Sequence, residues 1–69
     1  MIYFKVKELL ETNNMSRYRL RIISELTYER VNQFYFNTAK SIKVSEIDIL
    51  CNIFDCAVSD LFVYVKDLK

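Results

Sequence analysis

Residues 16–35 read SRYRLRIISELTYERVNQFY, and most of the fold can be predicted from them. Ser16 is a favourable N-cap residue and predicts a helix over residues 17–24. Thr27 is a second N-cap and predicts a helix over residues 28–36. Two short helices joined by so tight a connection are typical of a helix-turn-helix unit.

Both helices divide into an apolar and a polar side. The apolar positions of the first are Tyr18, Leu20, Ile22 and Ile23. In the second helix the inward residues are Val31, Phe34 and Tyr35, and the outward residues are Tyr28, Glu29, Asn32 and Gln33. The outward side of the second helix is therefore predicted to face solvent.

The chain before this unit predicts a short strand and one further helix. Apolar and other residues alternate along residues 2–7, which favours an extended segment. From Val6 the apolar period becomes helical, so we expect a helix over residues 6–13. Asn13 and Asn14 are suitable for its end, because Asn tolerates the left-handed conformation of a C-terminal cap.

The chain after the unit begins with a polar connection over residues 37–43. Ser45 predicts the N-cap of a fourth helix, and Asp48 is spaced to return a hydrogen bond to that cap. The inward side of this helix consists of Ile47, Leu50, Cys51 and Phe54. Ser59 predicts the cap of a last, short helix.

Residues 62–65 are β-branched or aromatic, which favours an extended end of the chain that can pair with residues 2–5. The prediction is thus a mainly α, compact five-helix domain with short N- and C-terminal strands. We expect residues 1–69 to form one domain, because a chain of this length has room for a single core. A core this small contributes only about 3–5 kcal/mol, which favours a homodimer.

The charges are unevenly distributed along the chain. Residues 1–43 contain eight Lys or Arg and four Asp or Glu, whereas residues 44–69 contain two and five. The basic half is where a polyanion such as double-stranded DNA would bind.

Enzyme activity is not expected, because the chain has no His and no Gly to supply the commonest base or a phosphate-binding loop. Cys51 and Cys56 have neither redox nor zinc spacing, and we interpret them as buried thiols. No cofactor, metal or small-molecule ligand is therefore predicted. The apolar start, Met1 to Phe4, is interrupted at Lys5, so we expect a soluble, cytoplasmic protein without a signal peptide or membrane span.

The order of these pieces resembles the Cro and phage-repressor-like helix-turn-helix family, also called XRE-like or lambda-repressor-like. The matching stretches are residues 6–10, 15–20, 26–35, 49–56 and 60–62. Two departures lie inside the motif. Arg21 stands where the family usually has a small residue, and Glu25 stands where it usually has Gly because the turn needs positive φ. Ile22 and Ile23 also stand where the family often has polar residues.

The resemblance implies that the second helix of the unit enters the major groove of DNA while the first crosses the backbone. Asn and Gln can then pair with adenine, Glu can accept from cytosine, and Arg30 can take guanine or a phosphate. Helix N-termini and basic side chains would bind phosphates. The predicted DNA-binding residues are Arg17, Thr27, Tyr28, Glu29, Arg30, Asn32, Gln33, Lys40 and Lys43.

The resulting hypothesis is a sequence-specific transcriptional regulator, a repressor of the phage or mobile-element type, that acts as a homodimer. We expect the dimer surface to use Phe62, Tyr64 and Val65, or the fourth helix, because the basic half must stay free. The alternative is a helix-turn-helix fold used as a protein-interaction module, such as an antirepressor or antitoxin, without DNA binding. Arg21, Glu25 and the apolar Ile22 and Ile23 motivate this alternative.

Overall fold

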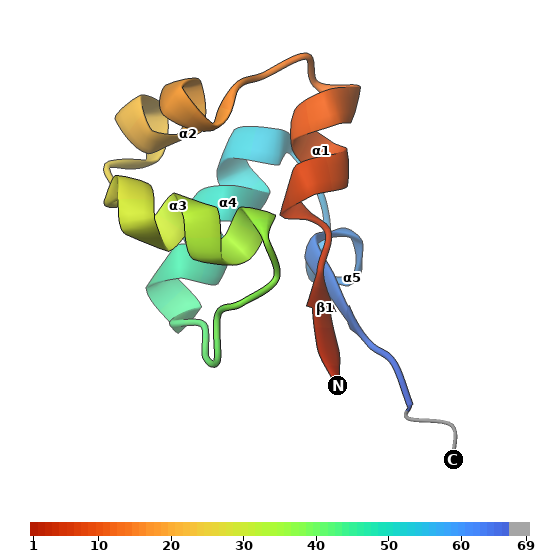
Figure 1. Ribbon diagram of the computed structural model, residues 1–69. Coiled ribbons are helices and arrows are strands. Elements are labelled where there is room, and N and C mark those ends of the chain that lie inside the picture. Colours follow the sequence, from red (N-terminus) through yellow and green to blue (C-terminus); the bar gives the residue numbers. More distant parts are fainter. Residues whose placement is uncertain (67–69) are drawn as a thin grey trace.

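The computed structural model describes residues 1–66, and over these it contains five helices and two short strands (Figure 1). The elements in chain order are β1 (Ile2–Phe4), α1 (Val6–Thr12), α2 (Arg17–Ser24), α3 (Tyr28–Tyr35), α4 (Val44–Phe54), α5 (Val58–Leu61) and β2 (Phe62–Tyr64). The helices pack together, and the strands extend side by side from one end of them. The predicted mainly helical fold with paired terminal strands is confirmed.

Both predicted N-caps of the helix-turn-helix unit are present. The Ser16 hydroxyl accepts a hydrogen bond from the N–H of Arg19 at 3.1 Å. The Thr27 hydroxyl does the same for the N–H of Arg30, also at 3.1 Å. Because each hydroxyl satisfies a backbone donor that has no partner within its helix, it fixes where that helix begins. α3 ends at Tyr35, one residue before the predicted end.

Positive φ values occur at four described residues, each just after a helix. They are Asn14 (52°), Glu25 (62°), Asn37 (59°) and Asp55 (50°). Since the chain contains no Gly, residues with side chains must adopt the left-handed conformation that usually ends a helix. Asn14 lies where the end of the first helix was predicted.

The core draws on every helix and on β1. Its buried apolar residues are Phe4, Val6, Leu10, Leu20, Val31, Phe34, Leu50, Phe54 and Leu61. In α2 the buried residues are Leu20 and Ser24, which lie one turn apart. The prediction that Tyr18, Ile22 and Ile23 belong to the apolar side was wrong, because all three are exposed. Tyr18 and Ile22 lie on the other side of α2 from Leu20, and Ile23 lies at the edge of the buried side.

The two strands pair antiparallel, with Ile2 opposite Tyr64 and Phe4 opposite Phe62. The Phe4 ring anchors this sheet to the core. Its centroid lies 5.2 Å from that of Phe34 and 5.9 Å from that of Phe62, in edge-to-face geometry, which is favourable for aromatic pairs. The sheet is therefore attached at its inner end and more exposed at its outer end.

α4 begins earlier than predicted, at Val44, with Lys43 in place of Ser45 as the N-cap residue. The N–H of Lys43 donates to the carboxylate of Glu46 at 2.9 Å. Glu46 thus makes the return bond that was predicted for Asp48. A residue without a capping hydroxyl can begin this helix because a carboxylate one turn later takes up its backbone N–H.

α5 also begins two residues earlier than predicted, at Val58. Its N-cap is Ala57 instead of Ser59, and the N–H of Ala57 donates to the Asp60 carboxylate at 3.3 Å. Among residues 1–66, no helix is long and apolar enough to cross a membrane.

Candidate nucleic-acid interface

The N-terminal half of α3 lies at the surface of the molecule (Figure 1). Thr27, Tyr28 and Glu29 are exposed, while Val31 and Phe34 on the other side of the helix are fully buried. Because α3 is anchored by its apolar side, its outward residues have fixed positions. These positions agree with the predicted inward and outward sides.

Asn32 and Gln33 are only half-buried, and each is bonded to an arginine. Arg17 donates from Nη1 to the Asn32 side-chain oxygen at 2.8 Å. Arg30 donates from Nη1 to the Gln33 side-chain oxygen, also at 2.8 Å. Sequence reasoning treated the two amides as independent groups and missed both bonds.

Arg17 reaches α3 from the first turn of α2. Its guanidinium carbon lies 4.6 Å from the centroid of the Tyr35 ring and 5.1 Å from that of Phe36. Such cation–π contacts favour one position of an otherwise flexible side chain. Arg17 is therefore held against α3 by stacking as well as by its bond to Asn32.

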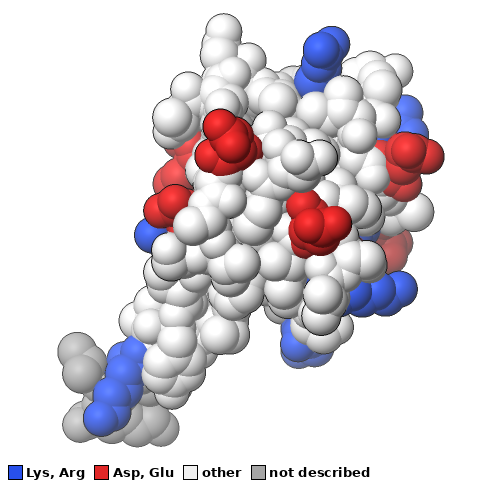
Figure 2. Space-filling view, turned by 180° about the vertical axis from the view of Figure 1, so that it is seen from behind, with Lys and Arg blue, Asp and Glu red and all other residues white. Residues whose placement is uncertain are grey.

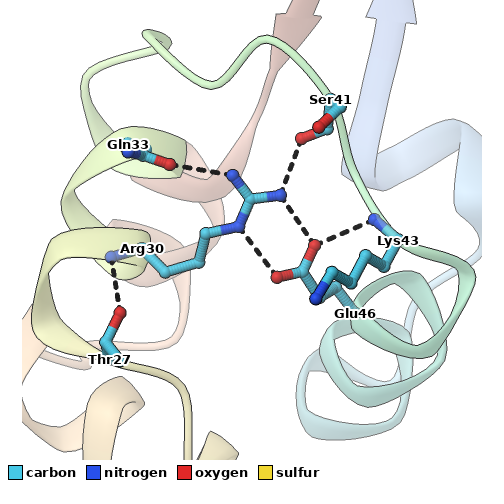
Figure 3. Close-up of polar contacts among 6 residues, drawn as sticks. All are labelled: Thr27, Arg30, Gln33, Ser41, Lys43 and Glu46. Carbon is cyan, nitrogen blue, oxygen red and sulfur yellow. Dashed lines mark hydrogen bonds and ion pairs between the residues drawn. The ribbon is translucent and has the colours of Figure 1, made fainter.

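Arg30 turns away from the outward side of α3 and joins it to α4 (Figure 3). Its Nε and Nη2 donate to the two carboxylate oxygens of Glu46, each at 2.8 Å. Nη2 also donates to the backbone oxygen of Ser41 at 2.7 Å. Paired parallel bonds of this kind are the strongest arginine–carboxylate geometry. The predicted guanine or phosphate contact competes with these partners and with Gln33.

Glu46 is a buried carboxylate, with 6% of the residue exposed. Hydrogen bonds from Arg30 hold its pKa below the ordinary value; burial opposes this effect, and the Lys43 N–H reinforces it. Donating hydrogen bonds to Glu46 raises the pKa of Arg30 in turn. Both groups are therefore charged at neutral pH, and the link between α3 and α4 is an ion pair.

The predicted lysines lie in and at the end of the connection after α3. Lys40 and Lys43 are both exposed. Lys43 borders an open hollow of about 480 Å³ between this connection and the turn before α3. The hollow is lined by Glu25, Leu26, Thr27, Arg30, Ser41, Lys43 and Glu46. The structure thus brings Thr27, Arg30 and Lys43 to one place, and Arg17 and Asn32 to another.

The side of the molecule seen from behind carries scattered charges. Figure 2 shows this side, on which separate acidic side chains stand in a mostly uncharged surface and Lys and Arg lie around its rim. α4 and α5 lie toward this side of the molecule (Figure 1). A polyanion approaching from the side of α3 would avoid these acidic groups.

A family model for the Cro/C1-type HTH DNA-binding domain matches residues 5–67. The match includes all five helices and β2. The chain belongs to this family. The resemblance predicted from the sequence is thereby confirmed, and α2 and α3 are the helix-turn-helix unit of a Cro/C1-type domain. A search of curated proteins found no match.

This Cro/C1-type domain accommodates both unusual residues of its motif. Glu25 adopts φ of 62°, so the turn has the positive φ that Gly would otherwise provide. Arg21 is half-buried, and its guanidinium carbon lies 5.3 Å from the centroid of the Tyr18 ring on the same helix. The charged end of Arg21 therefore lies against Tyr18 on the same helix and not in the core.

α2 exposes apolar residues that are not part of the buried core. Tyr18 is 60% exposed, Ile22 51% and Ile23 40%. Tyr18 and Ile22 are one turn apart, so they are neighbours on the helix surface. This exposed apolar group is the feature that favours a protein partner.

Proposed function

We propose that this chain is a sequence-specific DNA-binding regulator, a repressor of the phage or mobile-element type that acts in the cytoplasm. The observation that carries the proposal is the exposed N-terminal half of α3 within a capped helix-turn-helix unit of a DNA-binding family. In such units the N-terminal residues of the second helix reach base edges in the major groove.

The proposed base contacts come from Tyr28, Glu29, Asn32 and Gln33. Tyr28 and Glu29 are exposed, and the two amides lie one turn further along α3. Phosphates would be bound by Thr27 and the free N–H groups at the helix starts, together with Lys40 and Lys43. Arg17 lies against Asn32 and belongs with the base contacts. Arg30 keeps a positioning role, because its bonds to Glu46 orient α3 against α4.

The proposal includes a homodimer on a two-fold operator, with half-sites about 34 Å apart. The outer end of the sheet is a suitable dimer surface. Tyr64 is 71% exposed, Val65 47%, and Ile2, opposite Tyr64, 43%. Phe62 packs against the core and is less available. Sedimentation equilibrium of the wild type and Tyr64→Lys tests this surface, and an unchanged dimer in the variant would direct attention to α4.

The test of DNA binding is fluorescence anisotropy with a random-core duplex pool over a salt series. We expect binding to weaken steeply with salt, with a log–log slope of about −0.9 for each phosphate contacted. Lys43→Ala should make that slope shallower by about 0.9, the value for one phosphate contact. Lys66, an exposed lysine beyond β2, provides the matched control, because Lys66→Ala should leave the slope unchanged. A folded protein that binds no duplex at low salt would contradict the proposal.

A second candidate function is a protein-interaction module such as an antirepressor or antitoxin. It is favoured by the exposed Tyr18, Ile22 and Ile23 of α2. Substituting Ile22 and Tyr18 with Ser should leave DNA binding intact if the chain acts as a repressor. Loss of a biological effect in that variant, with DNA binding unchanged, would favour the module instead.

A further inference from the structure

The bond between Arg17 and Asn32 determines which atoms of Asn32 remain available. A guanidinium has only donors, so the Asn32 atom 2.8 Å from Arg17 Nη1 must be the side-chain oxygen. The amide N–H₂ group of Asn32 is then the part that does not face Arg17. Arg17 itself has five N–H donors, of which this bond uses one.

An Asn side chain recognises adenine by accepting from N6 and donating to N7 at the same time. Here the positively charged Arg17 lies against the oxygen that would have to accept. That oxygen keeps a second lone pair, but the N6 amino group of adenine would have to approach it beside the Arg17 guanidinium, whose N–H donors repel another donor. Guanine presents the opposite pattern, because N7 and O6 are both acceptors. The Arg17–Asn32 pair, which can offer a donor from each residue, matches guanine.

We propose that the Arg17–Asn32 pair recognises a guanine in each half-site, and that Arg17 sets this preference. The inference rests on the proposed function, in which α3 lies in the major groove. It replaces the adenine contact that the residue type of Asn32 alone suggests.

The position of Arg17 is fixed before DNA arrives. Its guanidinium stacks on Tyr35 and Phe36, with ring centroids 4.6 and 5.1 Å away. A side chain already held in place loses less conformational freedom on binding, so its contact contributes more to affinity. The Arg17–Asn32 pair therefore acts as one preformed unit.

Gln33, the residue after Asn32, also has its side-chain oxygen bonded to an arginine. Its side-chain oxygen accepts from Arg30 at 2.8 Å, so its N–H₂ group is the free part. Glu29, one turn before Asn32 on α3, has only acceptors when ionised, and cytosine N4 is the donor it fits in the major groove. The outward side of α3 thus favours G·C pairs.

Phosphate oxygens are also acceptors, so Arg17 and Asn32 could in chemical terms bind the backbone. A guanine base and a backbone phosphate give different results in a binding experiment. A guanine contact discriminates among bases at one position, whereas a phosphate contact affects all sequences alike. The experiment must therefore measure base preference as well as affinity.

The experiment begins by selecting the operator from a random duplex pool with the wild-type protein. Asn32→Ala then identifies the position at which base preference is lost. At that position we expect guanine in the wild-type site, and replacing it with 7-deazaguanine, which lacks the N7 acceptor, should weaken binding. A complete bidentate contact corresponds to about 5- to 140-fold weaker binding when another base replaces guanine.

Arg17→Met tests the role of Arg17 while keeping an apolar stem on the aromatic rings. We expect guanine preference at that position to fall and adenine to be accepted, because the Asn32 oxygen is then free. Arg17→Lys, which retains a donor, should preserve more of the guanine preference. Arg19→Met is the matched control, since Arg19 is exposed on the same helix and its loss should leave base preference unchanged. Melting curves verify that each variant is folded.

Adenine at this position in the wild-type operator would overturn the inference, as would guanine preference that persists in Arg17→Met. An Arg17→Met variant that binds every sequence equally less well would assign Arg17 to a phosphate and also overturn it. If the folded wild type binds no DNA, the proposed function itself fails, and this result differs from all of the others.

Discussion

Arg30→Met removes the link between α3 and α4 and leaves Glu46 buried without its partner. Glu46 would lose two charge-assisted bonds of 2.8 Å and keep the one from the Lys43 N–H. Removing one member of a buried pair typically costs about 3–5 kcal/mol. The Arg30 side chain is 20% exposed and that of Glu46 8%, so we expect a value near the lower end, about 3 kcal/mol.

The assay is urea unfolding followed by far-ultraviolet circular dichroism at pH 7. In thermal unfolding of a domain of this size, a loss of about 3 kcal/mol in the free energy of unfolding corresponds to a decrease in Tm of roughly 12–24 °C. The double variant Arg30→Met with Glu46→Leu should recover most of this loss, because apolar residues of similar volume often replace a buried ion pair without cost. Arg19→Met is the control and should change stability by less than about 0.5 kcal/mol.

Two results would refute this reasoning. The first is a loss below about 1 kcal/mol in Arg30→Met, which is the range of surface ion pairs. The second is a double variant as unstable as the single one, since the cost would then come from lost packing of Arg30 on the Phe34 ring, 4.5 Å from its guanidinium carbon. In either case the buried charge of Glu46 would not be the cause.

Further predictions concern pH and two turns. Because the pKa of Glu46 is lower in the folded than in the unfolded chain, the unfolded state binds more protons between the two values and stability rises with pH there. The pair therefore contributes its full stability above about pH 4.5, the ordinary pKa of a glutamate, and this contribution is lost at lower pH. The urea midpoints of the wild type and Glu46→Gln should converge as the pH is lowered. Midpoints that keep a constant difference across this pH range would contradict the prediction. Glu25→Gly should stabilise the chain by up to about 1 kcal/mol, because Gly adopts positive φ without steric cost; the greater flexibility of Gly in the unfolded chain offsets part of this gain. Glu25→Val should destabilise the chain. In thermal melts the Tm of Glu25→Gly must therefore lie above that of Glu25→Val. Asn37→Ala should lower the free energy of unfolding by about 1–3 kcal/mol, because the N–H of Phe4 donates to the Asn37 side chain at 2.9 Å and Asn37 has positive φ. The rate of amide hydrogen exchange at Phe4 should then increase more than the rates in α4.

The helices of the binding unit were predictable because their signals are local. Ser16 and Thr27 cap the helices that directly follow them, and the period of Val31 and Phe34 identifies the buried side of α3. The terminal strands were also predictable, from the alternation and β-branched residues at the two ends. These features depend on residues only a few positions apart.

Several of the features that could not be predicted depend on residues far apart in the chain. The cap of α4 at Lys43 requires Glu46, which Arg30 holds from 16 residues away. The bond from Arg17 to Asn32 spans 15 residues. Sequence reasoning saw Arg30 and Asn32 as polar residues on a helix and assigned them to DNA separately. The internal bonds that change what each can offer appear only when the helices are packed.

The four helix ends with positive φ have a further consequence, because each carries a side chain where Gly would carry none. At Glu25 and Asp55 that side chain is an exposed acid on a backbone of fixed shape. Replacing such an acid by Asn or Gly changes the net charge while the backbone stays in a conformation that both residues accept. Evolution can therefore adjust the electrostatic potential, and with it the solubility of the domain, at its turns without altering a helix or the core.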